Sequence, residues 1–292
     1  MLSQQIINGI MLGSIYALVG VSFTMTIGIL NFLNFSIPSI FMLGGMISWA
    51  LIAWGGLPWP LGVMLGIASG GIASLIVERF TYRRLKGSHP DVPLISSVGF
   101  LVLFENLVIL YFGAYIQRFP TPFGDANLRI SGLVVSIPQL CSLLLTVLLV
   151  LMLHYILRRT QLGRSLRAIA ENPNTALVVG IDTNRIVPML FLISGIFTAL
   201  GGVVFATNYH QVSPFIGNEV TLKGVAAMII GGMGNIWGAV IGGLLLGLTE
   251  AISIHMFGGS ISEVVIFAFL LLLICILPTG LFGDRNVRAE RV

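Results

Sequence analysis

The sequence predicts an all-α integral membrane protein, a polytopic helical bundle of about eight transmembrane spans with a broken or re-entrant glycine-rich segment. Of the 292 residues, 56% are hydrophobic and 9% are charged, which leaves too little polar surface to solvate a soluble domain. Apolar stretches of about 20 residues, the length with which a helix crosses a bilayer, recur along the chain. Basic residues fall mostly in short segments between these stretches. We expect residues 1–292 to form a single transmembrane domain.

The predicted spans follow the apolar stretches in order, with ends defined only to within several residues. They cover residues 6–30, 37–54, 61–80, 92–113, 137–157, 186–209 and 260–277. Between the last two lies segment 224–256, where three glycines and Asn235 interrupt the apolar character at 231–235. A broken helix, a re-entrant hairpin or two short elements would each fit this pattern. Because the backbone polar groups at a break must be buried in protein or face water, we expect the break inside the bundle.

The basic residues predict the orientation of the chain. Twelve of the fifteen Lys and Arg residues lie in segments 79–86, 158–185 and 285–291. Positive residues favour the cytoplasmic side, so these segments should be cytoplasmic and the N-terminus periplasmic. A cytoplasmic C-terminus then requires an even number of crossings after Arg185. Segment 224–256 should therefore cross twice, or enter and leave on one side.

The longest polar part of the chain is segment 158–186, which contains five arginines. It is rich in good helix formers, and we expect a short helix at the membrane surface, where the protein would meet a soluble partner.

Glycines in the last third of the chain predict close helix packing. Gly234, Gly238 and Gly242 recur every fourth residue, so that one face of a helix is nearly bare backbone. Small residues allow helices to approach closely in membranes. Packing within this chain and contact with another subunit both remain possible from this pattern.

Several kinds of chemistry find no support in the sequence. It contains no Gly-Lys dipeptide and hence no Walker A loop, no His-Glu-x-x-His zinc pair and no Gly-x-Ser-x-Gly turn. We therefore predict no catalytic residue, no metal site and no cofactor. The net charge of +4 comes from short clusters between apolar runs, so nucleic acid is not an expected partner.

Several segments together resemble a known family, the LivH-type permease subunits of ABC importers for branched-chain and related hydrophobic amino acids. The similar segments include LGSIYALVGVSFTMTIGILNF (12–32), TQLGRSLRAIAENPNTALVVGID (160–182), SPFIG (213–217), Lys223, GGMGNIWGAVIGG (231–243) and LPTGLFG (277–283). The likeness runs almost end to end. One departure is that Ser36, Ile37 and Pro38 follow Asn34-Phe35, where the family usually has Ala-His-Gly, so that the substrate preference is open.

The resemblance implies a role for segment 158–186 as a cytoplasmic coupling segment that docks on an ABC ATP-binding subunit. The residues implied are Arg164, Arg167, Ala168, Glu171, Ala176 and Gly180. The alternative is a solvated basic loop that only sets the topology. Further implied partners are a second permease subunit and a periplasmic substrate-binding protein, in the lipid of a bacterial inner membrane. Loops 114–136 and 210–222 would face the periplasm and are candidates for docking the binding protein.

Polar residues within spans are candidates for the translocation path. A charge at the centre of a span costs roughly 2.5–3.5 kcal/mol on insertion scales, so it tends to face protein or water. Each such residue is either a hydrogen-bonded structural group or part of a polar lining that contacts an amino acid's ammonium and carboxylate. The candidates are Asn8, Tyr16, Asn31, Asn34, Glu105, Asn106 and Glu250. A stand-alone secondary transporter or channel would also explain them, but would explain the basic segment less well.

Overall fold

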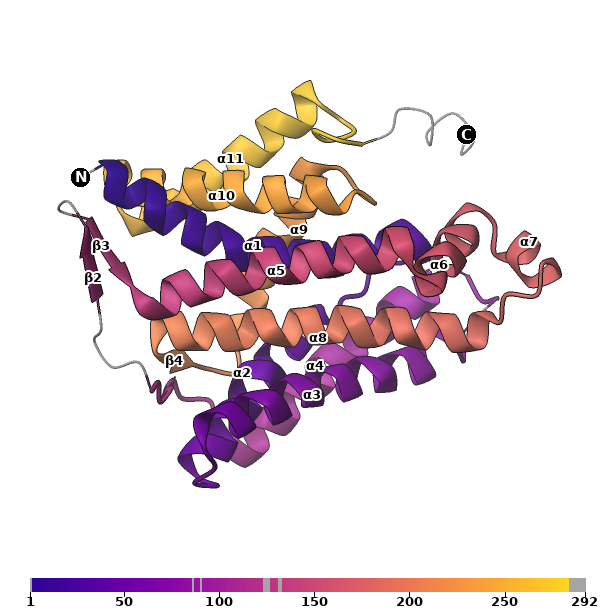
Figure 1. Cartoon of the computed structure of the whole chain (residues 1–292), viewed down its shortest axis with the longest axis horizontal. Coiled ribbons are helices and arrows are strands. Elements are labelled where there is room, and N and C mark those ends of the chain that lie inside the picture. Colours follow the sequence, from indigo (N-terminus) through magenta and orange to yellow (C-terminus); the bar gives the residue numbers. More distant parts are fainter. Residues whose placement is uncertain (1, 86, 90, 123–126, 131–132, 284–292) are drawn as a thin grey trace.

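The structure is a computed structural model that describes residues 2–85, 87–89, 91–122, 127–130 and 133–283. Long helices run side by side along one axis, with short strands at one end and two short helices at the other (Figure 1). Within the described residues, six helices are long and apolar enough to cross a membrane, and two shorter helices are also apolar. The predicted all-α membrane protein is therefore confirmed, whereas this structure does not establish a count of eight spans.

The helices and strands have the following bounds. The helices are α1 (Leu2–Leu30), α2 (Ile37–Ala53), α3 (Trp59–Val77), the π-helical η1 (Glu78–Tyr82), α4 (Asp91–Phe112), α5 (Ile137–Arg159), α6 (Gln161–Glu171), α7 (Pro173–Val178), α8 (Thr183–Tyr209), α9 (Ile216–Gly231), α10 (Ile236–Phe257) and α11 (Gly259–Ile276). The strands are β1 (Gln117–Arg118), β2 (Asn127–Ile130), β3 (Leu133–Ser136) and β4 (Gln211–Val212).

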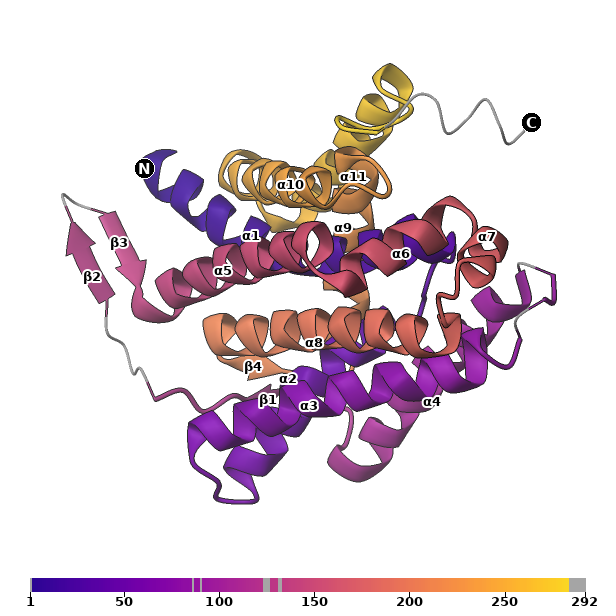
Figure 2. The same ribbon diagram turned by 45° about the vertical axis from the view of Figure 1, so that its right-hand side comes forward.

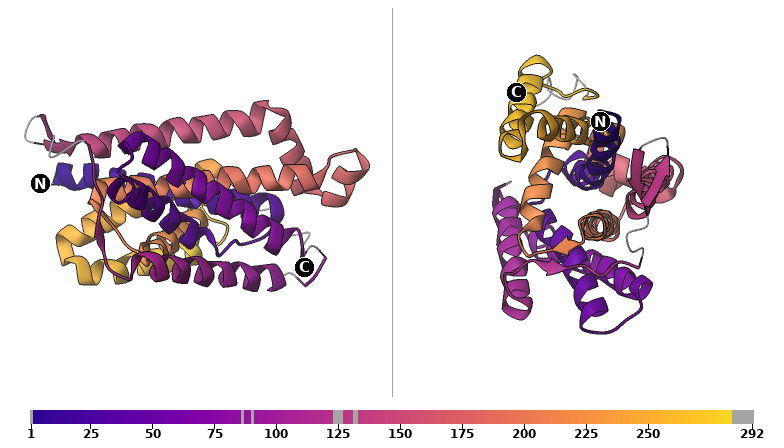
Figure 3. Two further views of the ribbon diagram at one scale, coloured as in Figure 1. Left: turned by 90° about the horizontal axis from the view of Figure 1, so that it is seen from below. Right: turned by 90° about the vertical axis from the view of Figure 1, so that its left-hand side faces the viewer.

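Helix α1 is the centre of the bundle and packs against α5, α8, α9 and α10 (Figure 3). Its middle residues Leu18, Val19 and Val21 are completely buried. A helix that is covered by neighbours on every side has no polar face to present to water, which explains why the apolar residues of the first span are not confined to one face. Segments from both halves of the chain therefore share one core.

Two short antiparallel strand pairs lie at the end of the bundle that is opposite α6 and α7 (Figure 1). In one pair, β2 runs against β3 as a hairpin. In the other, β1 pairs with β4, so that the connection after α4 is tied to the connection between α8 and α9. These strands were not predicted from the sequence, because two to four residues are too few for a period-two pattern.

Helix α2 begins inside the bundle, where Asn34, Ser36 and Ile37 are buried. The side-chain oxygen of Asn34 accepts hydrogen bonds from the backbone N–H of Ser36 at 3.1 Å and from its hydroxyl at 2.7 Å. The backbone N–H of Phe35 donates to the hydroxyl of Ser97 on α4 at 3.0 Å. These bonds satisfy backbone groups that lipid could not, so the chain can change direction within the membrane.

The break at 231–235 lies at the edge of the bundle, so the predicted position inside the bundle is correct only for its first half: Gly231 and Gly232 are buried, whereas Met233 and Gly234 are exposed. Helix α9 ends at Gly231, the turn exposes 61% of Met233, and α10 begins at Ile236. The side chain of Asn235 supports the turn by accepting hydrogen bonds from two backbone N–H groups of α10. Gly232 and Gly234 have φ angles of 103° and 92°, a conformation that glycine adopts without strain. The segment forms two helices joined by a partly buried turn.

The glycines of α10 lie against other helices of the same chain. A Cβ atom on Gly238 would come within 2.3 Å of the Gly231 carbonyl oxygen, and one on Gly242 within 2.1 Å of the Ala227 carbonyl oxygen, both on α9. The turn residue Gly234 lies beside Gly28 of α1, with 3.6 Å between a Cβ placed on Gly234 and the Gly28 Cα. Intrachain packing thus accounts for the spacing of the three glycines.

The closest approach of α1 and α10 gives a first prediction. A Cβ atom on Gly247 would lie 2.3 Å from the backbone nitrogen of Gly13, so Gly247→Val must push the two helices apart. Overpacking of this kind costs about 1–3 kcal/mol or more, and we expect a lower unfolding temperature for the purified protein. Gly99→Val on α4 is the matched control, because nothing lies within 4 Å of that site. Equal unfolding temperatures of the two variants would contradict this account of the helix contact.

The basic segment 285–291, which was predicted to be cytoplasmic, lies outside the described residues. In the described part, α1 begins at one end of the bundle and α6 and α7 lie at the other (Figure 2).

Candidate functional site

The polar segment between α5 and α8 forms two consecutive helices, α6 and α7. The Thr160 hydroxyl caps α6 by accepting from the backbone N–H of Gly163 at 3.3 Å. On the inner side of α6, Leu166 and Ile169 are buried against the bundle. Arg164 and Glu171 lie on its exposed side. This alternation is that of an amphipathic helix that lies on the end of the bundle.

Arg167 and Ala168 lie next to this inner side. The guanidinium of Arg167 donates a hydrogen bond to the Leu157 carbonyl oxygen at the end of α5, so this arginine also joins two helices of the chain. Ala168 is half-buried.

Helix α7 leads into an apolar tip, which we define as Leu177, Val178 and Val179. The Asn172 side chain caps this helix by accepting from the backbone N–H groups of two residues in its first turn. Leu177, Val178 and Val179 are 48%, 87% and 75% exposed, and α7 projects from the end of the bundle (Figure 1). The apolar tip was not predicted, although three consecutive apolar residues in a polar segment are a visible signal.

Ala176 and Gly180 shape the chain around the apolar tip. Ala176 is buried, and its carbonyl oxygen accepts a hydrogen bond from the backbone N–H of Ile181 at 3.0 Å. Gly180 has a φ angle of 89°, which favours glycine. These two predicted coupling residues therefore contribute backbone geometry, while the neighbouring residues present the exposed surface.

A buried polar triad joins α1, α9 and α10. The Tyr16 hydroxyl donates to Oε2 of Glu250 at 2.7 Å, and the Lys223 ammonium forms an ion pair with Oε1 of the same carboxylate. The Lys223 nitrogen also lies 5.7 Å from the centre of the Tyr16 ring, within cation–π range. Two of the predicted path residues, Tyr16 and Glu250, thus meet across 234 positions of the sequence.

Lys223 was not among the predicted path residues. The predicted segment began at residue 224, which left Lys223 at the edge of a loop, whereas α9 begins at Ile216 and contains it. A lone lysine before an apolar run was the available signal, because a charge at membrane depth needs a partner.

A second polar contact joins α4 and α9. The Asn218 side chain donates to Oε1 of Glu105 at 2.6 Å. Glu219, the next residue of α9, is exposed. The carboxylates of Glu105, Glu219 and Glu250 and the ammonium of Lys223 therefore lie on α9 and on the neighbouring helices α4 and α10, which are mostly apolar. We define the α9 polar face as the set Glu105, Asn218, Glu219, Lys223 and Glu250.

Other predicted path residues form hydrogen bonds within their own helix or at its beginning. The Asn106 side chain donates to the Val102 carbonyl oxygen of its own helix at 2.8 Å. Asn8 accepts from Gln4, also on α1, at 3.3 Å. Asn34 accepts from the residue before α2. Asn31 follows α1 and is exposed, with a φ angle of 51°.

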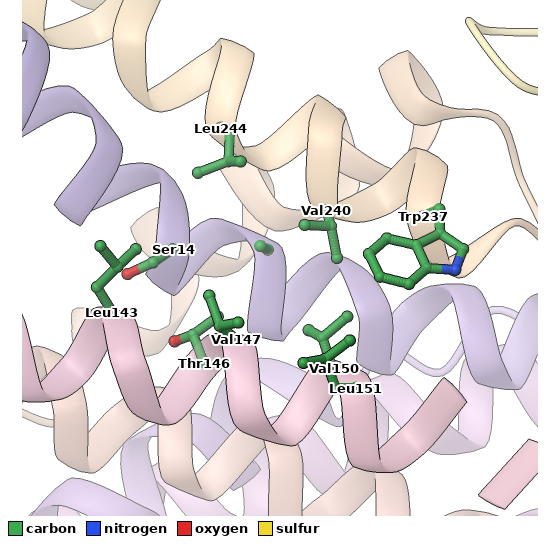
Figure 4. A pocket seen from close by; sticks show the side chains of 10 residues that line it. Ser14, Leu143, Thr146, Val147, Val150, Leu151, Trp237, Val240 and Leu244 are labelled. Carbon is green, nitrogen blue, oxygen red and sulfur yellow. The ribbon is translucent and has the colours of Figure 1, made fainter. Parts of the chain in front are cut away.

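An apolar groove of about 100 Å³ lies between α1, α5 and α10 (Figure 4). Its two hydroxyl side chains, Ser14 and Thr146, donate to backbone carbonyl oxygens of their own helices at 2.6 and 2.9 Å. At one end the Trp237 indole N–H contacts Nδ1 of His154 at 3.0 Å and links α10 to α5. The groove therefore suits an apolar group and lacks the charged residues of the α9 polar face. In the described part of the chain, no cluster of His, Cys, Asp or Glu side chains could hold a metal ion.

Comparison with known proteins gives a consistent result. Residues 5–275 match a protein family described as "Branched-chain amino acid transport system / permease component". The chain is 33% identical over 298 residues to BraD of Pseudomonas aeruginosa, a high-affinity branched-chain amino acid transport system permease protein, with 97% of this chain and 96% of BraD covered. It is 32% identical over 302 residues to the corresponding protein LivH of Escherichia coli, with the same shares covered.

Among solved structures, PsaBC from Streptococcus pneumoniae in complex with Fab has a similar fold. The TM-score is 0.51 at 13% sequence identity, and the superposition covers 96% of this chain and 93% of that chain. At this identity the likeness concerns the fold alone.

Proposed function

This chain belongs to the branched-chain amino acid transport permease family, and we propose that it lines the translocation path of an ATP-driven importer together with a second permease. As a member of this family it is a multi-pass membrane permease and not an enzyme. The proposed cargo is a branched-chain or related amino acid. Residues 1–292 would form one permease domain, with 158–186 as its coupling segment.

The observation that carries the proposal is the α9 polar face. Its carboxylates and ammonium lie on helices that also expose large apolar residues, such as Leu103, Leu107 and Leu222. Lipid cannot solvate charged groups, which in membranes face protein or water. A second permease packed over this side of the bundle would cover the apolar rim and leave the polar groups facing a path between the subunits.

The proposed orientation places α6 and α7 in the cytoplasm. It is supported by the five arginines of segment 158–185, which are expected on the cytoplasmic side. The N-terminus would then be periplasmic and the C-terminus cytoplasmic. Loop 114–136 and the connection 210–215 would face the periplasm, where a substrate-binding protein would dock and deliver its cargo. This connection is shorter than the predicted loop 210–222, because α9 begins at Ile216.

The proposed energy source is a separate ATP-binding subunit that docks on the coupling segment. The exposed apolar tip supports this proposal, since exposed apolar residues often mark interaction sites. Helix α6 packs against α7 and contacts α1, α5 and α8, so a movement imposed at the apolar tip would reach three spans as a rigid body.

Purification of this chain from its native membranes in mild detergent tests the proposal. We expect an ATP-binding subunit and a second permease to be recovered with it, together with ATPase activity and ATP-dependent leucine uptake after reconstitution with the binding protein. Recovery of a single polypeptide without ATPase activity, in several detergents, would favour a stand-alone transporter instead.

A further inference from the structure

The ion pair between Lys223 and Glu250 is buried, unlike two surface ion pairs of the described residues. Its side chains are only 15% and 8% exposed, whereas the side chains of the pairs His89–Asp91 and Arg185–Asp182 are at least half exposed. A buried pair of this kind contributes little net stability compared with apolar residues of similar size. Its presence on the α9 polar face therefore indicates a role besides packing.

The surroundings of Lys223 match the charges of an amino acid. Glu219 lies one helical turn before Lys223 on α9 and is exposed, and residues four apart face the same side of a helix. Leu222 is 61% exposed, and Phe215, which directly precedes α9, is 49% exposed. One side of α9 thus combines a carboxylate that can accept from an ammonium (Glu219), an ammonium that can donate to a carboxylate (Lys223) and apolar side chains.

We propose that Lys223 binds the carboxylate of the transported substrate and that Glu250 is its counter-ion in the resting state. This inference rests on the proposed function. The substrate carboxylate replaces Glu250 on the Lys223 ammonium, while the Glu219 carboxylate receives the substrate ammonium. The ligand class is a zwitterionic α-amino acid with an apolar side chain, which Leu222 and Phe215 contact.

The contacts of Glu250 allow such an exchange. Its two oxygens have separate partners, because Tyr16 donates to Oε2 and Lys223 to Oε1. When Lys223 turns to the substrate, the Tyr16 hydroxyl still donates to the carboxylate, and hydrogen bonds to charged groups are the stronger ones. Tyr16 is therefore a positioning residue that retains Glu250 while the ion pair is open.

Two double variants of the reconstituted complex test the proposal. Lys223→Gln/Glu250→Gln keeps a polar pair without charge, and Lys223→Glu/Glu250→Lys keeps a charged pair in reversed order. If the pair has only a structural role, both should transport leucine like the wild type. If Lys223 binds the carboxylate, we expect both to assemble normally and to lose uptake by about tenfold or more, since a hydrogen bond to a charged group contributes on that order.

Trp237→Phe is the matched control, because it removes the indole hydrogen bond to His154 on the α5 side of α10 and should leave uptake unchanged. Wild-type uptake by either double variant would overturn the proposal. Failure of both variants to assemble would also contradict it, because the proposal requires that the pair can open in the folded protein. Uptake by the wild-type complex establishes the proposed function separately, whatever the variants show.

Discussion

The double variant Val178→Asp/Val179→Asp is expected to abolish ATP-driven uptake while the permease itself stays folded. Both valines are largely exposed, so the substitutions remove no contact of the core. At an interface with an ATP-binding subunit, the variant would lose the burial of two valines, about 1.5–3 kcal/mol each, and would bury two carboxylates. Copurification of the ATP-binding subunit with the variant measures the effect directly.

The matched control for this prediction is Ser88→Asp/His89→Asp. These residues lie in the exposed connection between η1 and α4, and the control adds the same number of carboxylates outside the coupling segment. We expect it to retain the ATP-binding subunit. If Val178→Asp/Val179→Asp retains that subunit equally well, the apolar tip is not the docking site.

Glu250→Leu is expected to destabilise the permease by about 3–5 kcal/mol, because it leaves the buried Lys223 ammonium without its counter-ion. The Tyr16 hydroxyl loses its acceptor in the same step. The double variant Lys223→Met/Glu250→Leu removes both charges and should recover most of this stability. Thermal unfolding of the purified variants in one detergent, at one pH, measures both effects.

Glu263→Leu on α11 serves as the control for the loss of a carboxylate, since Glu263 is exposed. We expect its unfolding temperature to stay close to that of the wild type. An unfolding temperature of Glu250→Leu equal to that of Glu263→Leu would show that the folded protein does not need Glu250 as the counter-ion of Lys223.

The apolar spans were predicted well from the sequence because each depends on local composition. The predicted span 6–30 corresponds to α1 (Leu2–Leu30), and the predicted span 137–157 to α5 (Ile137–Arg159). Segment 158–186 also contains the expected short helix, since its amphipathic pattern is readable over a few turns. Within that segment the pattern did not reveal which side chains would be exposed at the apolar tip.

The candidate path was predicted only in part. Tyr16 and Glu250 were recognised as polar residues in spans, but their hydrogen bond depends on the packing of α1 against α10. Asn218 was missed because the beginning of α9 has no local signal, and Lys223 was missed because the predicted segment began one residue after it. The position of α9 depends on contacts with distant segments. One is that of Gly217, where a Cβ atom would lie 2.0 Å from the carbonyl oxygen of Pro38 in the first turn of α2.

By itself the sequence determined the membrane class, most spans and the polar coupling segment, because hydrophobicity and helix propensity act on neighbouring residues. Only the tertiary structure decided that α2 begins inside the bundle, that the break at 231–235 lies at its edge, and that Lys223 pairs with Glu250. These features depend on which distant segments supply hydrogen bonds and counter-ions to buried polar groups. In a membrane that choice follows from the packing of the helices, because lipid offers polar groups no alternative partner.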